Sequence, residues 1–185
     1  NVKVESGKYI LLEKTAGAVV TKLYMNSEPN LIEYEDVSDK ALYGPSGKPK
    51  IEDIKQADIA DCWLLAALGS LVNKNPSRIQ RMLHDDGNGY VFVRLFKVEA
   101  KNVTKNVRGV DQELPEYSFT PRILKIKKEL PKAKYNPDSG VWVKMIEKAY
   151  TAAGYTGTLG QGSNGKISGI EFGYSYVAFL VLTGE

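Results

Sequence analysis

The sequence contains one cysteine and one histidine among its 185 residues, and it has no long hydrophobic run. A single cysteine cannot form an internal disulfide, so Cys62 is either a buried apolar thiol or a reactive one. No segment approaches the ~20 apolar residues that cross a bilayer, and the N-terminus lacks the charged and then apolar pattern of a secretory signal. We therefore expect a soluble chain without a transmembrane segment, and its compartment, intracellular or secreted, stays open.

An excess of charge of one sign is also missing. The 25 basic and 22 acidic residues are scattered and give a net charge of +3, which provides no reason to expect nucleic acid or a membrane as partner. With 43% hydrophobic residues, the chain has the size and composition of one ordinary domain with a real core. It begins at Asn1 rather than Met, so we expect a trimmed chain or a fragment of a longer protein.

Turn-forming residues divide the chain near residue 47. Before this point, three short apolar stretches separated by glycine and proline predict short strands and turns. These stretches are residues 9–12, 18–20 and 31–32. The run GPSGKP at 44–49 closes this part of the chain. We predict a lead-in segment at 1–47 and a core domain at 48–185.

Apolar segments predict the helices of the core. Residues 61–73, DCWLLAALGSLVN, are apolar on nearly every face, which predicts a helix that is buried on all sides and ends before Pro76. Residues 141–152 place Trp142 and further apolar residues at helical spacing. A short amphipathic helix is expected at 76–83. A glycine-rich loop and a final helical or mixed stretch complete the chain.

The remaining segments predict a small antiparallel sheet. The turn DDGNG at 85–89 precedes an alternating strand at 90–96, and we expect a second strand at 122–130 after a long polar excursion. Lysines alternate loosely within 123–128, which is typical of a protected sheet edge rather than of a nucleic-acid patch. The predicted fold class is therefore α+β, with small antiparallel strands.

The position of Cys62 favours a reactive thiol. A lone cysteine on an apolar helix is more often part of the core. Cys62, however, falls in the predicted first turn of its helix, behind Asp61 as N-cap, where open N–H groups and the helix dipole favour the thiolate. Gln56, on the preceding loop, can bring its amide beside the Cys62 N–H to form a two-donor oxyanion hole, although a solvated loop amide is the simpler alternative.

Several segments resemble a known family. The run QADIADCWLLAALGSL at 56–71, preceded by the dipeptide DI, is similar to the active-site segment of calpains. Trp142 followed by the run IEKAY at 146–150 adds to the likeness, which covers about residues 50–185. It implies a papain-like cysteine protease fold, in which the cysteine helix forms one wall of a cleft. A second lobe, absent from this chain, would supply His and Asn.

The resemblance implies roles for four residues. Cys62 would be the nucleophile, Gln56 an oxyanion donor, and Gly173 and Trp63 part of the site that binds an extended protein or peptide substrate. The implied activity is that of a calpain-like cysteine endopeptidase, which this lobe alone would not show. Its implied partner is the missing C-terminal His/Asn lobe, on the same parent protein or on another chain. A protease-derived binding or regulatory module without turnover is the alternative.

Departures from the family pattern concern calcium. Animal members bind Ca²⁺ in this lobe through loop carbonyls and two carboxylates, and Asp53 matches one of the carboxylates. Gly140 stands where the other would be Glu, with Asp138 as a nearby substitute, because calcium accepts irregular shells of about six to eight oxygens. Ala57 and Ala60 replace two glycines of the pattern. No other cofactor is expected, and calcium binding through Asp53 stays open.

Two further features are weaker candidates. His84, the only histidine, lies in the predicted turn LHDDG, where a solvated side chain is more common than a catalytic base. The run GQGSNGK at 160–166 resembles a phosphate-binding loop, but Ile167 stands where that motif requires Ser or Thr, and no buried strand precedes it. We expect neither a catalytic base nor a nucleotide site in this chain.

Overall fold

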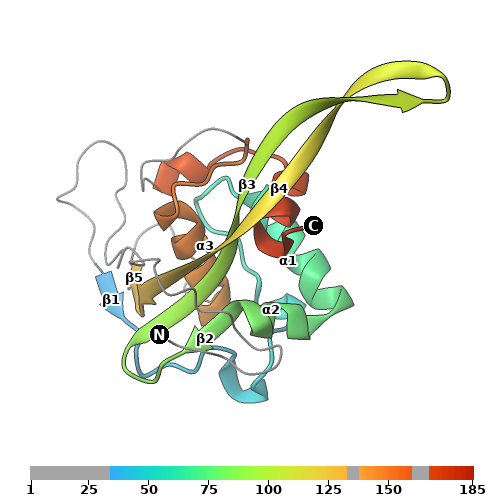
Figure 1. Ribbon diagram of the computed structural model, residues 1–185. Coiled ribbons are helices and arrows are strands. Elements are labelled where there is room, and N and C mark those ends of the chain that lie inside the picture. The colour runs from blue at the N-terminus through green and yellow to red at the C-terminus, as the bar shows by residue number, and fades with distance from the viewer. Residues whose placement is uncertain (1–33, 133–137, 160–166) are drawn as a thin grey trace.

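The computed structural model describes residues 34–132, 138–159 and 167–185 (Figure 1). Helices and antiparallel strands are combined in these ranges, so the α+β class is confirmed. The strands predicted at 9–12, 18–20 and 31–32 and the glycine-rich run at 160–166 lie outside the described residues. In the described ranges, no helix has both the length and the hydropathy needed to cross a membrane.

A three-stranded antiparallel sheet lies at the centre of the molecule. Its strands β2 (Leu83–Asp85), β3 (Tyr90–Val107) and β4 (Val110–Lys127) follow the order β2-β3-β4. At the base of β3, fully buried side chains such as Val91 alternate with half-buried ones. This alternation arises because successive side chains of a strand point to opposite faces. The alternating strand predicted from the sequence is therefore confirmed at the base of β3.

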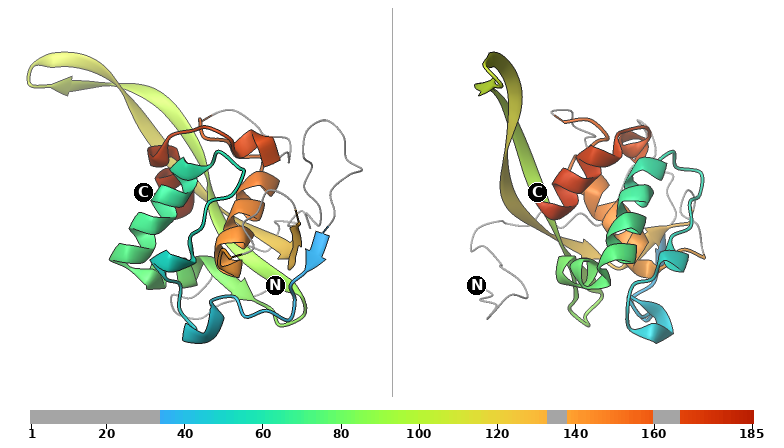
Figure 2. Two further views of the ribbon diagram at one scale, coloured as in Figure 1. Left: turned by 180° about the vertical axis from the view of Figure 1, so that it is seen from behind. Right: turned by 90° about the vertical axis from the view of Figure 1, so that its right-hand side faces the viewer.

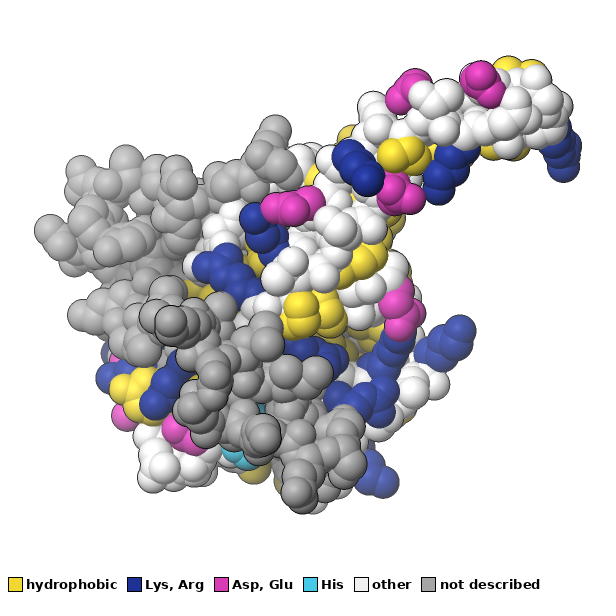
Figure 3. Space-filling model, in the orientation of Figure 1, with side chains coloured by type: hydrophobic (Ala, Val, Ile, Leu, Met, Phe, Trp, Pro, Cys, Tyr) yellow, Lys and Arg dark blue, Asp and Glu magenta, His cyan; other side chains and the backbone are white. Residues whose placement is uncertain are grey.

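The two strands are longer than predicted, because β3 and β4 continue through the polar excursion and past the body as a long ribbon (Figure 1). Their pairing runs without a break to Val107 and Val110. Arg108 (φ 53°) and Gly109 (φ 85°) close the ribbon. Positive φ at both central residues is the tight hairpin turn whose twist matches that of the strands. Side chains of both charge signs lie along the outer ribbon (Figure 3).

Helices cover one face of the sheet in two layers (Figure 2). α3 (Val141–Ala152) and α4 (Ser175–Thr183) pack against β3, and α1 (Cys62–Lys74) packs against α4 on the side away from the sheet. α2 (Pro76–Met82) directly follows α1 and packs beside β2. The three helices predicted before residue 153 and the helical C-terminal stretch are thus confirmed.

The second predicted strand is broken near its end. β4 stops at Lys127, and the chain then continues as β5 (Glu129–Pro131), which pairs with β1 (Tyr34–Asp36) in a separate two-stranded sheet. β4 lies at the edge of the central sheet, as the alternating lysines predicted. Residues 34–36 of the predicted lead-in segment therefore pair with a strand of the predicted core domain. The domain boundary near residue 47 stays a prediction.

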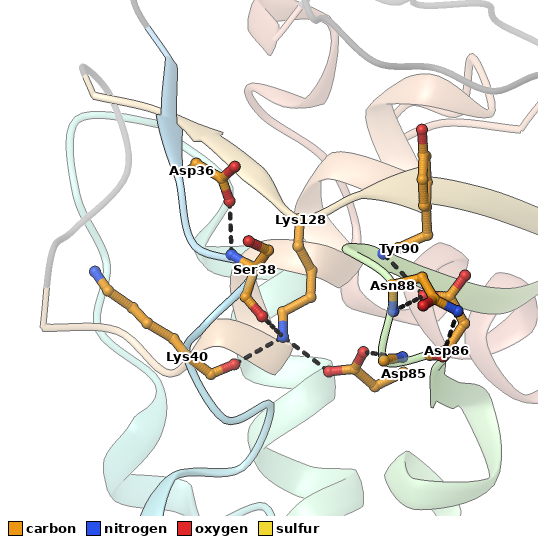
Figure 4. A network of polar contacts seen from close by, with 9 residues as sticks. Asp36, Ser38, Lys40, Asp85, Asp86, Asn88, Tyr90 and Lys128 are labelled. Atoms are coloured by element: carbon orange, nitrogen blue, oxygen red, sulfur yellow. Dashed lines mark hydrogen bonds and ion pairs between the residues drawn. The ribbon is translucent and has the colours of Figure 1, made fainter.

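Lys128 sits at the break between β4 and β5 and is buried. Its ammonium donates hydrogen bonds to the carbonyl oxygens of Ser38 (3.1 Å) and Lys40 (2.7 Å) and to the Asp85 carboxylate (2.8 Å) (Figure 4). A buried charge is tolerated only with partners of this kind. These bonds join the lead-in segment, β2 and the end of β4 into one unit.

Candidate active site

Cys62 is the first residue of α1, and it is exposed. The carbonyl oxygen of Asp61 accepts hydrogen bonds from the backbone N–H groups of Leu64 (2.8 Å) and Leu65 (3.1 Å), which begins the helix. The Cys62 N–H has no backbone acceptor among the described residues, as is usual in a first helical turn. The helix start predicted at Cys62 is confirmed, and it places an exposed thiol beside an open N–H group.

The side chain of Asp61 does not cap this helix, which corrects the sequence prediction. It is 1% exposed, makes no capping hydrogen bond and lies against Glu147 of α3. Burial raises the pKa of Asp61, and burial together with the charge of Asp61 raises the pKa of Glu147 well above its usual value. Two adjacent buried carboxyl groups favour holding a proton over carrying two charges. This pair was missed because no local pattern places Glu147 beside Asp61.

Gln56 and Cys62 line one cavity of about 530 Å³. The structure therefore brings together the two residues that the sequence singled out for chemistry. The Gln56 amide nitrogen donates a hydrogen bond to the carbonyl oxygen of Ile59 (3.0 Å), which orders the loop in front of α1. A side-chain amide nitrogen carries two N–H groups and can donate twice.

The expected burial of α1 on all sides is wrong on one face. Cys62, Ala66, Ser70 and Asn73 are exposed and follow one another at helical spacing along the wall of this cavity. Their small or polar side chains explain why this stripe is not part of the core. We call these four residues the open face of α1.

Gly173 lies where a side chain would not fit. A Cβ atom there would collide with the backbone of Gly157 and come within 2.8 Å of the Trp63 ring. Gly157 and Gly173 form a parallel β-bridge, in which the Tyr174 N–H donates to the Gly157 carbonyl (3.0 Å). Successive peptide groups of an extended chain point in opposite directions, so the N–H and C=O of Gly173 face away from Gly157. No described residue binds them, which leaves an open strand edge.

The side chain of Trp63 packs next to Gly173 at this edge. Its side chain is buried, its indole N–H donates to the carbonyl oxygen of Ile170 (3.0 Å), and its ring makes an edge contact with Tyr150 at 5.5 Å between centroids. These contacts hold the residues around Gly173 against the start of α1. A direct part of Trp63 in substrate binding stays a prediction.

The residues considered for calcium do not fit a calcium site. The Asp53 carboxylate accepts hydrogen bonds from the Trp142 indole (2.7 Å) and the Lys50 N–H (2.9 Å), and its carbonyl accepts one from the Gly140 N–H (2.7 Å). A Cβ at Gly140 would come within 2.8 Å of the Asp53 Cβ, so a carboxylate cannot stand there without a shift. Asp138 is exposed, and the described residues contain no metal-binding cluster of three His, Cys, Asp or Glu. Nitrogen donors thus occupy oxygens that calcium needs.

His84 is not part of this site. It lies in β2 rather than in the predicted turn, opposite Phe92 of β3, with 6.2 Å between the ring centroids. It does not line the cavity that contains Cys62 and Gln56. Among the described residues, the site therefore contains a thiol and hydrogen-bond donors without an imidazole.

An exposed cysteine at a helix start, with an amide donor on the preceding loop, is an arrangement typical of cysteine proteases. Residues 34–167, more than half of the chain, match the calpain family of cysteine proteases. The chain belongs to this family. Comparison with curated proteins and with solved structures gave no match.

Proposed function

We propose that this chain is the nucleophile-bearing lobe of a papain-like endopeptidase that cleaves protein substrates. The observation that carries the proposal is the exposed Cys62 at the start of α1, in one cavity with Gln56. Sγ of Cys62 attacks the carbonyl carbon of the scissile peptide bond, and the leaving amine departs to give a thioester that water hydrolyses. The Gln56 amide and the Cys62 N–H bind the oxygen that becomes negative.

The open edge at Gly173 supports an extended substrate in this proposal. Peptides that add a strand to an exposed edge are held by their main chain, so many sequences can bind in the same orientation. The Gly173 N–H and C=O are oriented for such pairing. The hydrogen bond from the Phe172 N–H to the Ala60 carbonyl (2.9 Å) ties this edge to the loop that leads into Cys62.

The mechanism also requires a base that takes the thiol proton and donates it to the nitrogen of the leaving amine, and a third group that orients the base. The one histidine of the chain, His84, lies on β2 outside the cavity. We place the catalytic His and Asn on a second lobe that covers the open face of α1. The small side chains Ala66 and Ser70 on that face allow another surface to approach closely. The lobe can belong to the same parent protein or to another chain.

Hydrolysis of casein and fluorogenic peptides by the parent protein tests this function. We expect Cys62→Ala to abolish turnover, and Gln56→Ala to lower kcat by about 10²–10³-fold if Gln56 is an oxyanion donor. Val110→Ala at the distant ribbon tip serves as the matched control and should leave the rate unchanged. Turnover that survives Cys62→Ala would contradict the proposal. The family resemblance implies that the His and Asn of the second lobe lie in a Gly-His and an Asn-x-Trp segment. A parent protein that lacks both segments and binds peptides without cleaving them would support a non-catalytic module instead.

A further inference from the structure

A cavity of about 220 Å³ lies near the end of α1, whereas Cys62 stands at the start of that helix. Residues of α1, α2 and β3 line it, together with the end of α4. Leu71 and Leu182 form part of its apolar wall. Pockets for drug-sized ligands take up ~300–1,000 Å³, so this cavity fits a smaller group. It is separate from the cavity that contains Cys62 and Gln56.

Positive charge is in excess around this cavity. Among the described residues, its charged side chains are Arg78 and Arg81 of α2, Arg94 of β3 and Glu185. Three positive charges against one negative leave a net charge of +2. Arginine cannot give up its charge by losing a proton, whereas a lysine at the same place could. Figure 3 shows Lys and Arg side chains gathered in the region of α2. We call Arg78, Arg81 and Arg94 the arginine cluster.

The carboxylate of Glu185 shows that the arginine cluster accepts an anion. It accepts a hydrogen bond from a guanidinium nitrogen of Arg78. The Glu185 side chain is 68% exposed and that of Arg78 is 36% exposed, so water screens this ion pair and the carboxylate can leave at little cost. One carboxylate also balances only one of the three positive charges. The cavity therefore holds a weak internal anion that a stronger one can displace.

Two guanidinium groups of the cluster are held in place by protein contacts. Arg81 donates a hydrogen bond from Nη1 to the hydroxyl oxygen of Ser77 (3.0 Å). The guanidinium of Arg94 lies over the Phe96 ring, 5.5 Å from its centroid, and that ring packs against Gly184 at the end of α4. A contact through the face of a guanidinium leaves its in-plane N–H groups for hydrogen bonds. Groups ordered in advance lose less conformational freedom when a ligand binds.

We propose that the arginine cluster binds a phosphate monoester, whose phosphate group takes the place of the Glu185 carboxylate. Such a group carries a charge of about −1.5 to −2 at pH 7 and three strong acceptor oxygens. It balances more of the positive charge than a carboxylate does, and it can accept hydrogen bonds from several guanidinium groups at once. A small metabolite and a phosphorylated side chain of a protein both offer this chemistry. The site does not rest on the proposed function of Cys62.

The test measures binding of methyl phosphate to the 185-residue chain by titration calorimetry at pH 7.5 and low salt. We expect saturable binding with a Kd below about 1 mM. Methyl sulfate has nearly the same shape but a single negative charge, and we expect it to bind about 10-fold more weakly or worse because the attraction scales with charge. Addition of NaCl should weaken the binding of methyl phosphate.

Substitutions of opposite expected effect separate this site from general charge attraction. Arg78→Gln removes one charge and Arg94→Lys removes the planar fork, and each should weaken binding by about 10-fold or more. Glu185→Gln removes the competing carboxylate and should tighten binding. Lys101→Gln removes one positive charge from the outer ribbon and should leave the Kd unchanged. Circular dichroism shows that each variant is folded, and the two arginine variants lie on different elements, so one of them suffices.

Several results would overturn the site. They are no saturable binding up to about 10 mM, equal affinity for methyl phosphate and methyl sulfate, the same loss in Lys101→Gln as in Arg78→Gln, or no tighter binding in Glu185→Gln. A peptide with one phosphoserine distinguishes the two sources once methyl phosphate binds. Tighter binding than methyl phosphate assigns the phosphate to a protein, and weaker binding assigns it to a small molecule. Cleavage that depends on Cys62 is measured separately, so failure of this site leaves the proposed function standing.

Discussion

The indole N–H of Trp142 donates a 2.7 Å hydrogen bond to the carboxylate of Asp53. This bond joins the 3₁₀ turn η2 (Ile51–Asp53), which leads to Gln56, to the first turn of α3. Because Gly140 has no side chain, the side chains of Asp53 and Trp142 can pack beside its backbone. Protein atoms therefore hold the loop at the place where the family resemblance suggested calcium.

Calcium should accordingly not stabilise this chain. We expect the same unfolding temperature in millimolar calcium and in excess chelator. Trp142→Phe should lower the free energy of unfolding by about 1–3 kcal/mol, because it leaves the half-buried Asp53 carboxylate with the Lys50 N–H as its one remaining donor of the two described here. Asp53→Asn keeps an acceptor oxygen and should cost less. A saturable rise of several degrees on adding calcium, lost in Asp53→Asn, would show that a calcium site forms here.

The buried carboxyl pair predicts a fall of stability with rising pH. Burial first, and then the Asp61 charge, raises the pKa of Glu147 well above the value of an unfolded chain. Above about pH 4.5 the folded state therefore binds more protons than the unfolded state, and the free energy of unfolding decreases until the pH passes the folded pKa. Glu147→Gln should flatten this decrease and stabilise the protein at pH 8.

Urea unfolding at pH 5 and pH 8 measures this effect, with the exposed Glu52→Gln as control. The control should keep the pH dependence of the parent chain. A Glu147→Gln variant with the same pH dependence as the parent, or with a larger loss at pH 8, would mean that the buried pair does not hold a proton.

Lys148 should act in the opposite direction at alkaline pH. Its side chain is fully buried, and its ammonium donates to the carbonyl oxygens of Lys127 (3.0 Å) and Glu129 (2.7 Å). Burial lowers the pKa of Lys148 to about 8. Between about pH 8 and 10.5 the unfolded state binds more protons, so this group makes stability rise with pH, by up to ~3 kcal/mol. The difference between parent and Lys148→Met in urea unfolding at pH 7.5 and pH 10 isolates this contribution, and a constant difference would contradict it.

The candidate site could be located from local signals, whereas the groups that support it could not. Cys62 and Gln56 were found because a helix start and a donor six residues upstream are visible in the chain itself. The Asp61–Glu147 pair depends on two helices meeting in space. Burial of α1 on all sides was a wrong prediction because Ala66 counts as apolar in a helix pattern, yet it lies on the open face.

The ribbon was missed for a different physical reason. A strand is recognised by an apolar face that alternates with a polar one, and most of β3 after Phe96 buries neither face. The sequence signal that could have identified the ribbon is the pair Arg108-Gly109 between two valines, because this pair allows a two-residue hairpin turn. Such a turn can nucleate pairing without a hydrophobic core nearby.

The outer ribbon should therefore be dispensable for folding. We expect a variant in which residues 99–118 are replaced by Asn-Gly, joining the paired residues Val98 and Phe119, to unfold within a few degrees of the parent chain. The ion pair between Lys101 and Glu116 (3.3 Å) is exposed, and water screens such pairs so that they add little to stability. Thermal unfolding followed by circular dichroism measures the difference. Loss of cooperative unfolding would show that the ribbon supports the core.

The central claim is that Cys62 is a protease nucleophile whose base lies on another lobe. Its most direct test is the rate of casein and fluorogenic peptide cleavage by this chain alone, by the parent protein, and by both with Cys62→Ala. We predict no turnover by the chain alone and turnover by the parent that Cys62→Ala abolishes. Robust cleavage by the isolated chain that depends on Cys62 would contradict the two-lobe account, and cleavage by the parent that survives Cys62→Ala would contradict the role of Cys62 itself.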